Sequence, residues 1–169
     1  MRLRHQLSSA IIALGCIACG SSDSTGVLTD VEVTTDATSY VAQQIPGSAP
    51  YTRYSFRVIV RTTNRSLRSI DLSRCSSSSR SPTFGVVLHS DSASAYSAFD
   101  PAWACGGGVP PLTIRPGARR IDTLFVQGPN AFSGVTGEPR GVADGLMSLS
   151  MASEQGGLES NRFVVSRSP

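Results

Sequence analysis

Lysine is absent from this chain. All 15 basic residues among its 169 are arginine. Lysine is the side chain that forms Schiff bases with carbonyl substrates, acts in Ser-x-x-Lys acylases and holds phosphates in a P-loop. The sequence therefore excludes these three kinds of mechanism.

Charged residues of both signs are sparse. They make up 16% of the chain, too few for a coiled coil, while the apolar share of 40% is too high for a disordered chain. The length fits one domain. The 16 glycines and 10 prolines favour a fold with many turns and short strands.

Histidine is nearly absent, with two in the whole chain. His89-Ser90-Asp91 holds the residue types of a hydrolase triad, but the chain has no G-x-S-x-G nucleophile elbow. One histidine and scattered acids supply too few ligands for a metal site. We therefore predict that His89 is a solvated strand residue, and we expect no catalytic residue, metal or cofactor.

Two of the four cysteines form a C-x-x-C at Cys16 and Cys19, close to the start of the chain. Residues 1–6 are basic, and residues 7–18 are apolar or small, about 18 Å as a helix and too short for a hydrocarbon core of roughly 30 Å. This order is that of a secretory signal. A redox C-x-x-C needs a strand before it and a helix after it, and zinc needs two further ligands nearby.

The stretch "ALGCIACGSSDS" resembles the lipobox of bacterial lipoproteins, in which a small residue precedes an acylated cysteine. The resemblance implies cleavage after Ala18, lipidation of Cys19 and a membrane anchor. It departs from the family three positions before Cys19, where Cys16 stands in place of leucine. Gly20 follows the lipidated residue, which in two-membrane families favours the outer membrane over the inner membrane. Lipidation of Cys16, a plain secretory signal and an uncleaved anchor remain alternatives.

The chain is thus divided into a signal peptide at 1–18, a flexible tether at 19–27 and one domain at 28–169. Alternating apolar and polar residues predict eight or nine short strands, and no segment shows a sustained helical period. The fold class is therefore all-β, as a single sandwich or barrel. The clearest strand patterns cover 29–36, 54–62, 68–72, 83–90, 112–114, 119–126, 146–151 and 161–166.

Two of these strands have informative faces. In 54–62, one face carries Tyr54, Phe56, Val58 and Val60, and the other carries Arg57 and Arg61. In 119–126, Ile121, Thr123 and Phe125 share a face, with Arg120 and Asp122 opposite.

The segments "YSFRVIVRTTNRSLRSIDL" and "LTIRPGARRIDTLFV" resemble the immunoglobulin-like domains of bacterial envelope lipoproteins. They are more loosely similar to the bacterial proteinase-inhibitor-type (BsuPI-like) domain. The resemblance implies an immunoglobulin-like β-sandwich over roughly residues 28–166. The antibody-type Cys–Trp–Cys arrangement is not matched, because Trp103 lies just before Cys105.

Cys75 and Cys105 are the cysteines that remain after the leader. Export places them in an oxidising compartment, so we predict a disulfide. It would close a loop of about 31 residues and contribute roughly 3 to 4 kcal/mol. A reactive thiol is the alternative, although neither cysteine has a histidine or lysine nearby in the sequence to lower its pKa.

Arginine is concentrated in one segment. Residues 53–80 hold seven arginines against one acid, while residues 19–52 hold four acids and no arginine. One interpretation is cross-strand pairing of Asp30 and Glu32 with Arg57 and Arg61. The other is a face for an anionic envelope polymer or an acidic protein patch, formed by Arg53, Arg57, Arg61, Arg65 and Arg68. Nucleic acid is not expected, because the arginines have few aromatic neighbours on which bases could stack.

Together these features predict a non-catalytic, membrane-tethered envelope lipoprotein that acts as a binding or structural module. The alternative is an inhibitor of an envelope protease that works through an exposed loop, at 98–111 or 127–144.

The lipobox resemblance generates the first prediction. Cys19→Ala should move the protein from the membrane fraction to the soluble fraction of cells, because the thiol that carries the acyl chains is lost. Fractionation and immunoblotting measure this, with Cys16→Ala as the matched control. Release by Cys16→Ala, with Cys19→Ala still membrane-bound, would contradict the assignment.

Overall fold

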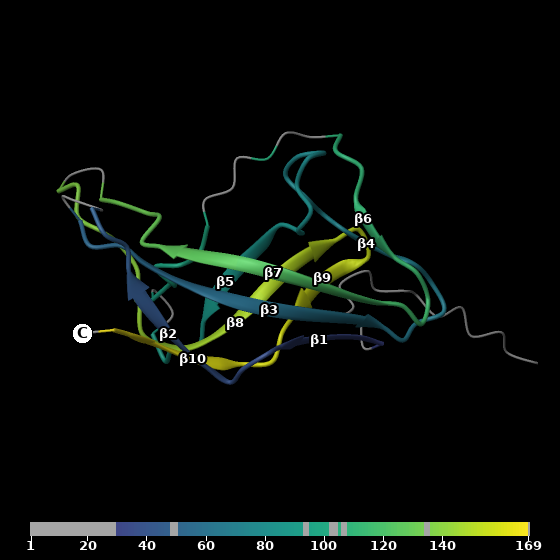
Figure 1. The fold of residues 1–169 in the computed structure, drawn as a ribbon, viewed down its shortest axis with the longest axis horizontal. Helices are drawn as coiled ribbons and strands as arrows, with labels where there is room; N and C mark the ends of the chain where they lie inside the picture. Colours follow the sequence, from purple (N-terminus) through teal and green to yellow (C-terminus); the bar gives the residue numbers. More distant parts are fainter. Residues whose placement is uncertain are drawn as a thin grey trace, which may run out of the picture.

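The computed structural model describes residues 30–47, 51–92, 95–101, 105, 108–133 and 136–168. These residues form ten strands (Figure 1). The all-β prediction is confirmed, whereas the proposed signal peptide and tether, with Cys16 and Cys19, lie outside the described ranges. The strands are β1 (Val31–Thr35), β2 (Ser39–Gln44), β3 (Tyr54–Asn64), β4 (Ile70–Leu72), β5 (Phe84–Leu88), β6 (Leu112–Ile114), β7 (Arg119–Gly128), β8 (Gly145–Ser153), β9 (Gly156–Glu159) and β10 (Phe163–Arg167).

The strands form one mixed sheet that curls into a half-barrel. Its order is β1-β3-β2-β10-β8-β4-β6, with β7 added to β3, and with β5 and β9 added to β8. All pairs are antiparallel except β2 with β10. Strand β2 joins the two halves, because Gln43 and Gln44 pair with β3 while residues 39–42 pair with β10. This topology does not show the immunoglobulin-like sandwich, which stays a prediction.

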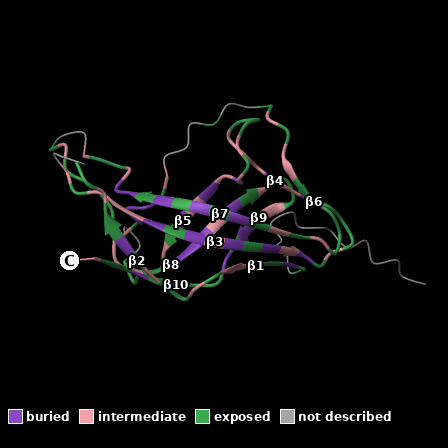
Figure 2. Cartoon of the chain, in the orientation of Figure 1, coloured by how far each residue is buried: buried purple, intermediate pink, exposed green. Residues whose placement is uncertain are grey.

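The core lies between the inner faces of the two halves. Val58 and Leu124 come from β3 and β7, Met147 and Leu149 come from β8, and all four are buried. The ring of Phe56 makes an edge contact with that of Phe99, with centroids 5.1 Å apart. Each large apolar side chain buried in this way contributes about 1.5 to 3 kcal/mol. Figure 2 shows buried and exposed bands alternating along β3 and β7, as a period of two requires.

Strand β3 runs further than its sequence pattern predicts. The predicted strand ends at residue 62, but β3 continues to Asn64, which is buried and polar. The Asn64 side chain donates from Nδ2 to the carbonyl oxygens of Ile114 (2.9 Å) and Arg68 (2.7 Å), and its Oδ1 accepts from the Ser66 amide (3.0 Å). Because these bonds satisfy the amide group, a polar residue can occupy the inner face.

Two strands were not predicted. Strand β2 lies between the predicted strands 29–36 and 54–62, and β9 lies between the predicted strands 146–151 and 161–166. The β2 sequence is largely polar, and its partners β3 and β10 are distant in the chain. In both cases tertiary pairing decides the conformation. Within the described ranges, no helix is long and apolar enough to cross a membrane.

The disulfide between Cys75 and Cys105 is present, as predicted. It joins the segment after β4 to the segment before β6, at a sequence separation of 30 and a Cα–Cα distance of 4.5 Å. The nearby Arg74 donates from Nε to the carbonyl oxygen of Pro110 (2.6 Å) and from Nη1 to that of Ser77 (3.0 Å). The bridge and this arginine therefore hold the same two segments together.

Loss of the bridge should destabilise the domain. For a loop of this length we expect Cys75→Ser with Cys105→Ser to lower the free energy of unfolding by about 3 to 4 kcal/mol, mainly because the unfolded chain gains freedom. Urea unfolding of the oxidised protein and of the double variant measures the difference. Equal midpoints, or two free thiols in the oxidised protein by intact-mass analysis, would contradict the prediction.

Candidate interaction surface on strands β3 and β7

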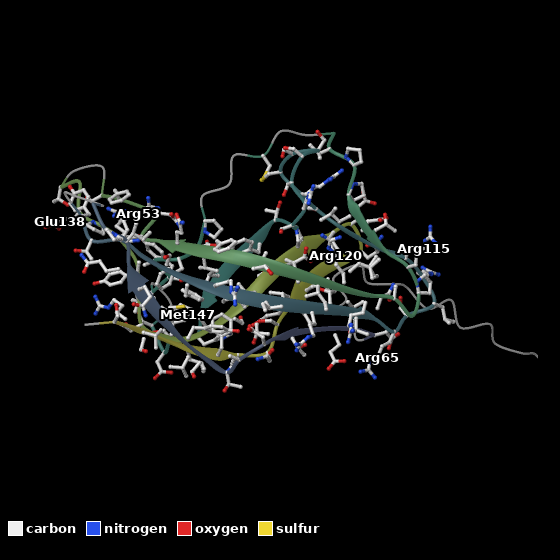
Figure 3. The ribbon with its side chains drawn as sticks, viewed as in Figure 1. Arg53, Arg65, Arg115, Arg120, Glu138 and Met147 are labelled. Atoms are coloured by element: carbon white, nitrogen blue, oxygen red, sulfur yellow. A yellow bond between two sulfur atoms is a disulfide. The ribbon has the colours of Figure 1, made fainter. Side chains whose placement is uncertain are left out.

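The arginines predicted to form one face are spread along the whole of β3. Figure 3 labels Arg53 at one end of the molecule and Arg65 near the other. Arg53 is half-buried and donates to Oδ1 of Asn130 (3.2 Å). Arg65 forms an ion pair with Glu32 (2.6 Å). Arg68 is exposed in the turn after β3.

Arg57 and Arg61 are the members of this set that share the outer face of β3. Both are exposed, and four residues along a strand separate them by about 13 Å. Neither takes part in an ion pair with a described residue. Of the five predicted arginines, these two therefore lie together on the outer face of β3.

Among the described residues, Glu32 forms an ion pair with Arg65 instead of with Arg57 or Arg61. Strand β1 does lie beside β3, as the interpretation of cross-strand pairing required. The register, however, places Glu32 opposite Thr63 and Thr34 opposite Arg61. Glu32 therefore reaches Arg65, and the main chain of Asp30 accepts a hydrogen bond from the Arg65 amide (2.8 Å). An exposed pair of this kind contributes about 0 to 1 kcal/mol.

Strand β7 places apolar side chains beside these two arginines. Phe125 lies opposite Arg57, and Ile121 lies opposite Arg61. Phe125 is 71% exposed and Ile121 is 54% exposed, which is unusual for large apolar residues in a regular strand. We call this surface the outer β3–β7 face and define it by Arg57, Ile59, Arg61, Ile121, Thr123 and Phe125.

The buried residues of β7 show which of its side chains point outward. Leu124 and Val126 are buried in the core, so their neighbours must point outward. Asp122 also points inward and is 4% exposed, where Arg120 donates two hydrogen bonds to its carboxylate (2.8 and 2.7 Å). The sequence pattern grouped these side chains correctly. It did not say which group was buried, because both faces carry apolar residues.

Asp36 lies at the border of this face. Burial raises the pKa of its carboxyl, but hydrogen bonds from the Tyr40 hydroxyl (2.7 Å) and the Ile59 amide (2.9 Å), together with the charge of Arg57, outweigh this and lower the pKa below its ordinary value. Burial and the bond to Asp36 raise the pKa of Tyr40 to about 12. The Asp36–Tyr40 pair links the end of β1 to β2 and β3 at the border of the outer β3–β7 face.

His89 takes part in a polar network that the sequence reading missed. Its Nε2 lies 2.9 Å from the Ser148 hydroxyl, which donates to Glu159 (2.6 Å). The His89 side chain is 19% exposed and Ser148 is fully buried, so the prediction of a solvated histidine is wrong. The same ring nitrogen faces both partners and the serine proton is directed to the carboxylate, whereas in a Ser–His–acid triad the histidine lies between the other two. The network links the end of β5 to β8 and β9.

A cleft of about 380 Å³ lies among Tyr51, Tyr54, Pro129, Pro139 and Arg167. The Arg167 guanidinium lies 5.6 Å from the centre of the Tyr54 ring, and its Nε donates to Asp144 (2.7 Å). That bond and the charge of Asp144 raise the pKa of Arg167. In the described part of the chain, no group of three histidine, cysteine or acidic side chains is placed to hold a metal ion.

No family model and no curated protein matches the chain. A solved structure described as a novel β-glucosidase, EmGH1, from Erythrobacter marinus is similar to it at 17% sequence identity, with a TM-score of 0.37 over 80% of this chain. The chain spans 15% of the length of that β-glucosidase. Similarity at this level carries no argument about fold or activity.

The Asp36–Tyr40 pair generates a prediction with a defined pH dependence. Tyr40→Phe should lower the free energy of unfolding by about 1 kcal/mol at neutral pH, because it removes one hydrogen bond to a carboxylate. The lowered pKa of Asp36 contributes stability above its unfolded value of about 3.9, and this stability is lost as the pH falls through the folded pKa. The variant should therefore lose less stability in acid.

The stability that Tyr40 contributes changes with pH in the opposite direction. Because the Tyr40 pKa is raised to about 12, its contribution is present below about pH 10 and is lost as the pH rises toward 12. Urea unfolding of both proteins across the pH range measures both changes. The same pH dependence in both proteins would contradict the assignment.

Proposed function

We propose that the protein is a non-catalytic binding module of the cell envelope that holds an anionic partner on the outer β3–β7 face. The observation that carries the proposal is the placement of two exposed arginines beside two exposed apolar side chains. Arg57 with Phe125 and Arg61 with Ile121 form two parallel rows across the paired strands.

The chemistry of these residues supports binding rather than a structural role. A guanidinium presents a planar fork of donors that matches a carboxylate or phosphate in two parallel hydrogen bonds. Arginine and aromatic residues are also enriched at protein interfaces. Arg57 interacts electrostatically with Asp36 but forms no ion pair with a described residue, so its guanidinium donors are available to a partner.

The envelope location is part of the same proposal. It is supported by the basic, apolar and small residues that precede Cys19 and by the lipobox resemblance. A diacyl or triacyl anchor would hold the module stably at a membrane, whereas a single acyl chain gives marginal binding. Gly20 after Cys19 favours the outer membrane over the inner membrane. The partner would then be an envelope protein or an anionic envelope polymer.

The protease-inhibitor alternative receives less support from the described loops. Ala98 and Phe99, at the start of the first candidate loop, are buried, so this part of the loop packs into the domain instead of projecting from it. In the second candidate loop, Phe132 contacts the ring of Tyr51 at 5.3 Å between centroids. An inhibition assay against envelope proteases tests this alternative directly.

Charge reversal on the face tests the proposal. Arg57→Glu with Arg61→Glu should weaken binding of poly-L-glutamate by at least about tenfold, or about 1.4 kcal/mol. Binding of the unaltered protein should also fall steeply with salt, because the Debye length shrinks from about 10 Å at 0.1 M to about 3 Å at 1 M. Fluorescence anisotropy with labelled poly-L-glutamate measures both effects.

The matched control is Arg140→Glu with Arg162→Glu, which makes the same change in net charge at two exposed arginines outside β3 and β7. It should bind within about twofold of the unaltered protein. Equal losses in the two double variants would show that net charge, and not this face, governs binding. Salt-independent binding would also overturn the proposal.

A further inference from the structure

One edge of β7 has no strand beside it in the described structure. Strand β7 pairs with β3 along its full length, from Arg119 opposite Thr63 to Gly128 opposite Tyr54. Among the described residues, no strand pairs with its other edge. Figure 1 shows β3 and β7 side by side along the length of the molecule, with β3 between β7 and β1.

The register decides which backbone groups lie at this edge. The Asn64 amide donates to the carbonyl oxygen of Ala118 (3.0 Å), so these residues form a hydrogen-bonded pair. Such pairs alternate with non-bonded pairs along antiparallel strands, so the even-numbered residues of β7 exchange hydrogen bonds with β3. The N–H and C=O groups of the odd-numbered residues point to the open edge: Arg119, Ile121, Thr123, Phe125 and Gln127.

An independent contact agrees with this parity. The Asn130 side chain donates from Nδ2 to the carbonyl oxygen of Gln127 (2.6 Å) and so closes one end of the open edge. In the described part of the chain, the outward backbone groups from Arg119 to Phe125 have no hydrogen-bond partner. The open segment therefore begins at Arg119 and ends at the Asn130 cap.

This edge lacks most of the features that protect exposed edges. Natural sheets protect them with short strands, proline, lysine or bulges. Strand β7 has ten residues, contains no proline or lysine, and keeps an unbroken register with β3. Asp122 points inward but forms an ion pair with Arg120. The backbone N–H and C=O groups of Asp122 face β3, so they do not lie at the open edge. The edge is thus competent to accept another strand.

We propose that an extended acidic segment of the partner adds to β7 as a further strand. This inference rests on the proposed function and names the partner's chemistry. A strand added about 4.8 Å from β7 lies roughly 9.6 Å from β3, within reach of arginine and glutamate side chains extended toward each other. Thr123, a small residue, lies between the rows of Arg57 and Arg61. An acid in line with Thr123 therefore has access to both guanidinium groups, while apolar residues two positions to either side of it share its face and cover Ile121 and Phe125.

Charge complementarity favours this occupant over a second copy of the chain. A second β7 would bring one acid, Asp122, which points inward and is paired with Arg120. It would leave Arg57 and Arg61 without a carboxylate. An acidic strand supplies the backbone groups and the counter-charge together.

The test uses the full chain in detergent and an eight-residue peptide with valine, glutamate and valine at positions 3, 5 and 7 and threonine elsewhere, so that the acid and the two valines share one face. Thr123→Pro removes an outward N–H without removing a hydrogen bond to β3, and it should weaken peptide binding at least about tenfold. Thr123→Val keeps the N–H, so any loss that it causes reports the side chain alone and is subtracted from the loss in Thr123→Pro. The same peptide with the amides of all its central residues N-methylated keeps its charge but has no edge able to pair, and it should also bind at least about tenfold more weakly. Calorimetric titration measures each affinity.

The outcomes separate the two proposals. If the plain and N-methylated peptides bind equally well, strand addition is overturned. If this binding is still lost in Arg57→Glu with Arg61→Glu, the proposed function of the outer β3–β7 face stands. No binding of the plain peptide at concentrations up to about 1 mM overturns strand addition, and failure to bind poly-L-glutamate as well overturns both. The methylated peptide keeps the test valid if Thr123→Pro fails to fold. A dimer of the unaltered chain that Thr123→Pro converts to a monomer would show a second copy at the edge and reject the acidic partner.

Discussion

The alternation along β3 is the constraint on which the rest of the structure depends. The odd-numbered residues of this strand direct their backbone groups to β1 and β2, as the bonds from Ile45 to Arg53, from Asp36 to Ile59 and from Arg65 to Asp30 show. The even-numbered residues direct theirs to β7 and their side chains to the core. A shift of one residue would place Arg57 and Arg61 in the core, at a cost of several kcal/mol for each unpaired charge. The register is therefore strongly specified.

The same constraint shapes the surface. Because β7 follows the parity of β3, Ile121 and Phe125 lie outside beside the two arginines, and their backbone groups lie at the open edge. Full burial of such a side chain contributes about 1.5 to 3 kcal/mol, and Ile121 and Phe125 forgo part of this. The Asp122–Arg120 pair on the inner side of β7 adds no apolar burial in return. The proposed partner would cover this exposed apolar area.

Local pattern was enough to predict part of this architecture. The alternation along β3 and the grouping of residues along β7 could be read from the sequence, because side chains in a strand repeat every two residues. The disulfide also followed, from the expected export and the two remaining cysteines. Strand β2 could not be predicted, since its polar sequence pairs with β3 and with β10, which lies far along the chain.

The candidate site was predicted in part for the same reason. The arginines of the 53–80 segment were visible, but which of them share a face depends on the register between strands. Glu32 was expected to pair with Arg57 or Arg61, and the register placed it near Arg65 instead. Phe125 and Ile121 could have been suspected from the apolar residues on both faces of 119–126. The open edge depends on how distant strands pair, and local sequence does not record this.

Amide hydrogen exchange along β7 in the free protein, measured residue by residue by NMR, tests the central claim most directly. The proposed register predicts an alternating pattern, because amides bonded to β3 are protected and those at an open edge are not. Asp122, Leu124 and Val126 should exchange slowly, whereas Ile121, Thr123 and Phe125 should exchange at close to the unprotected rate. Uniform protection along the strand, or the opposite parity, would contradict the account.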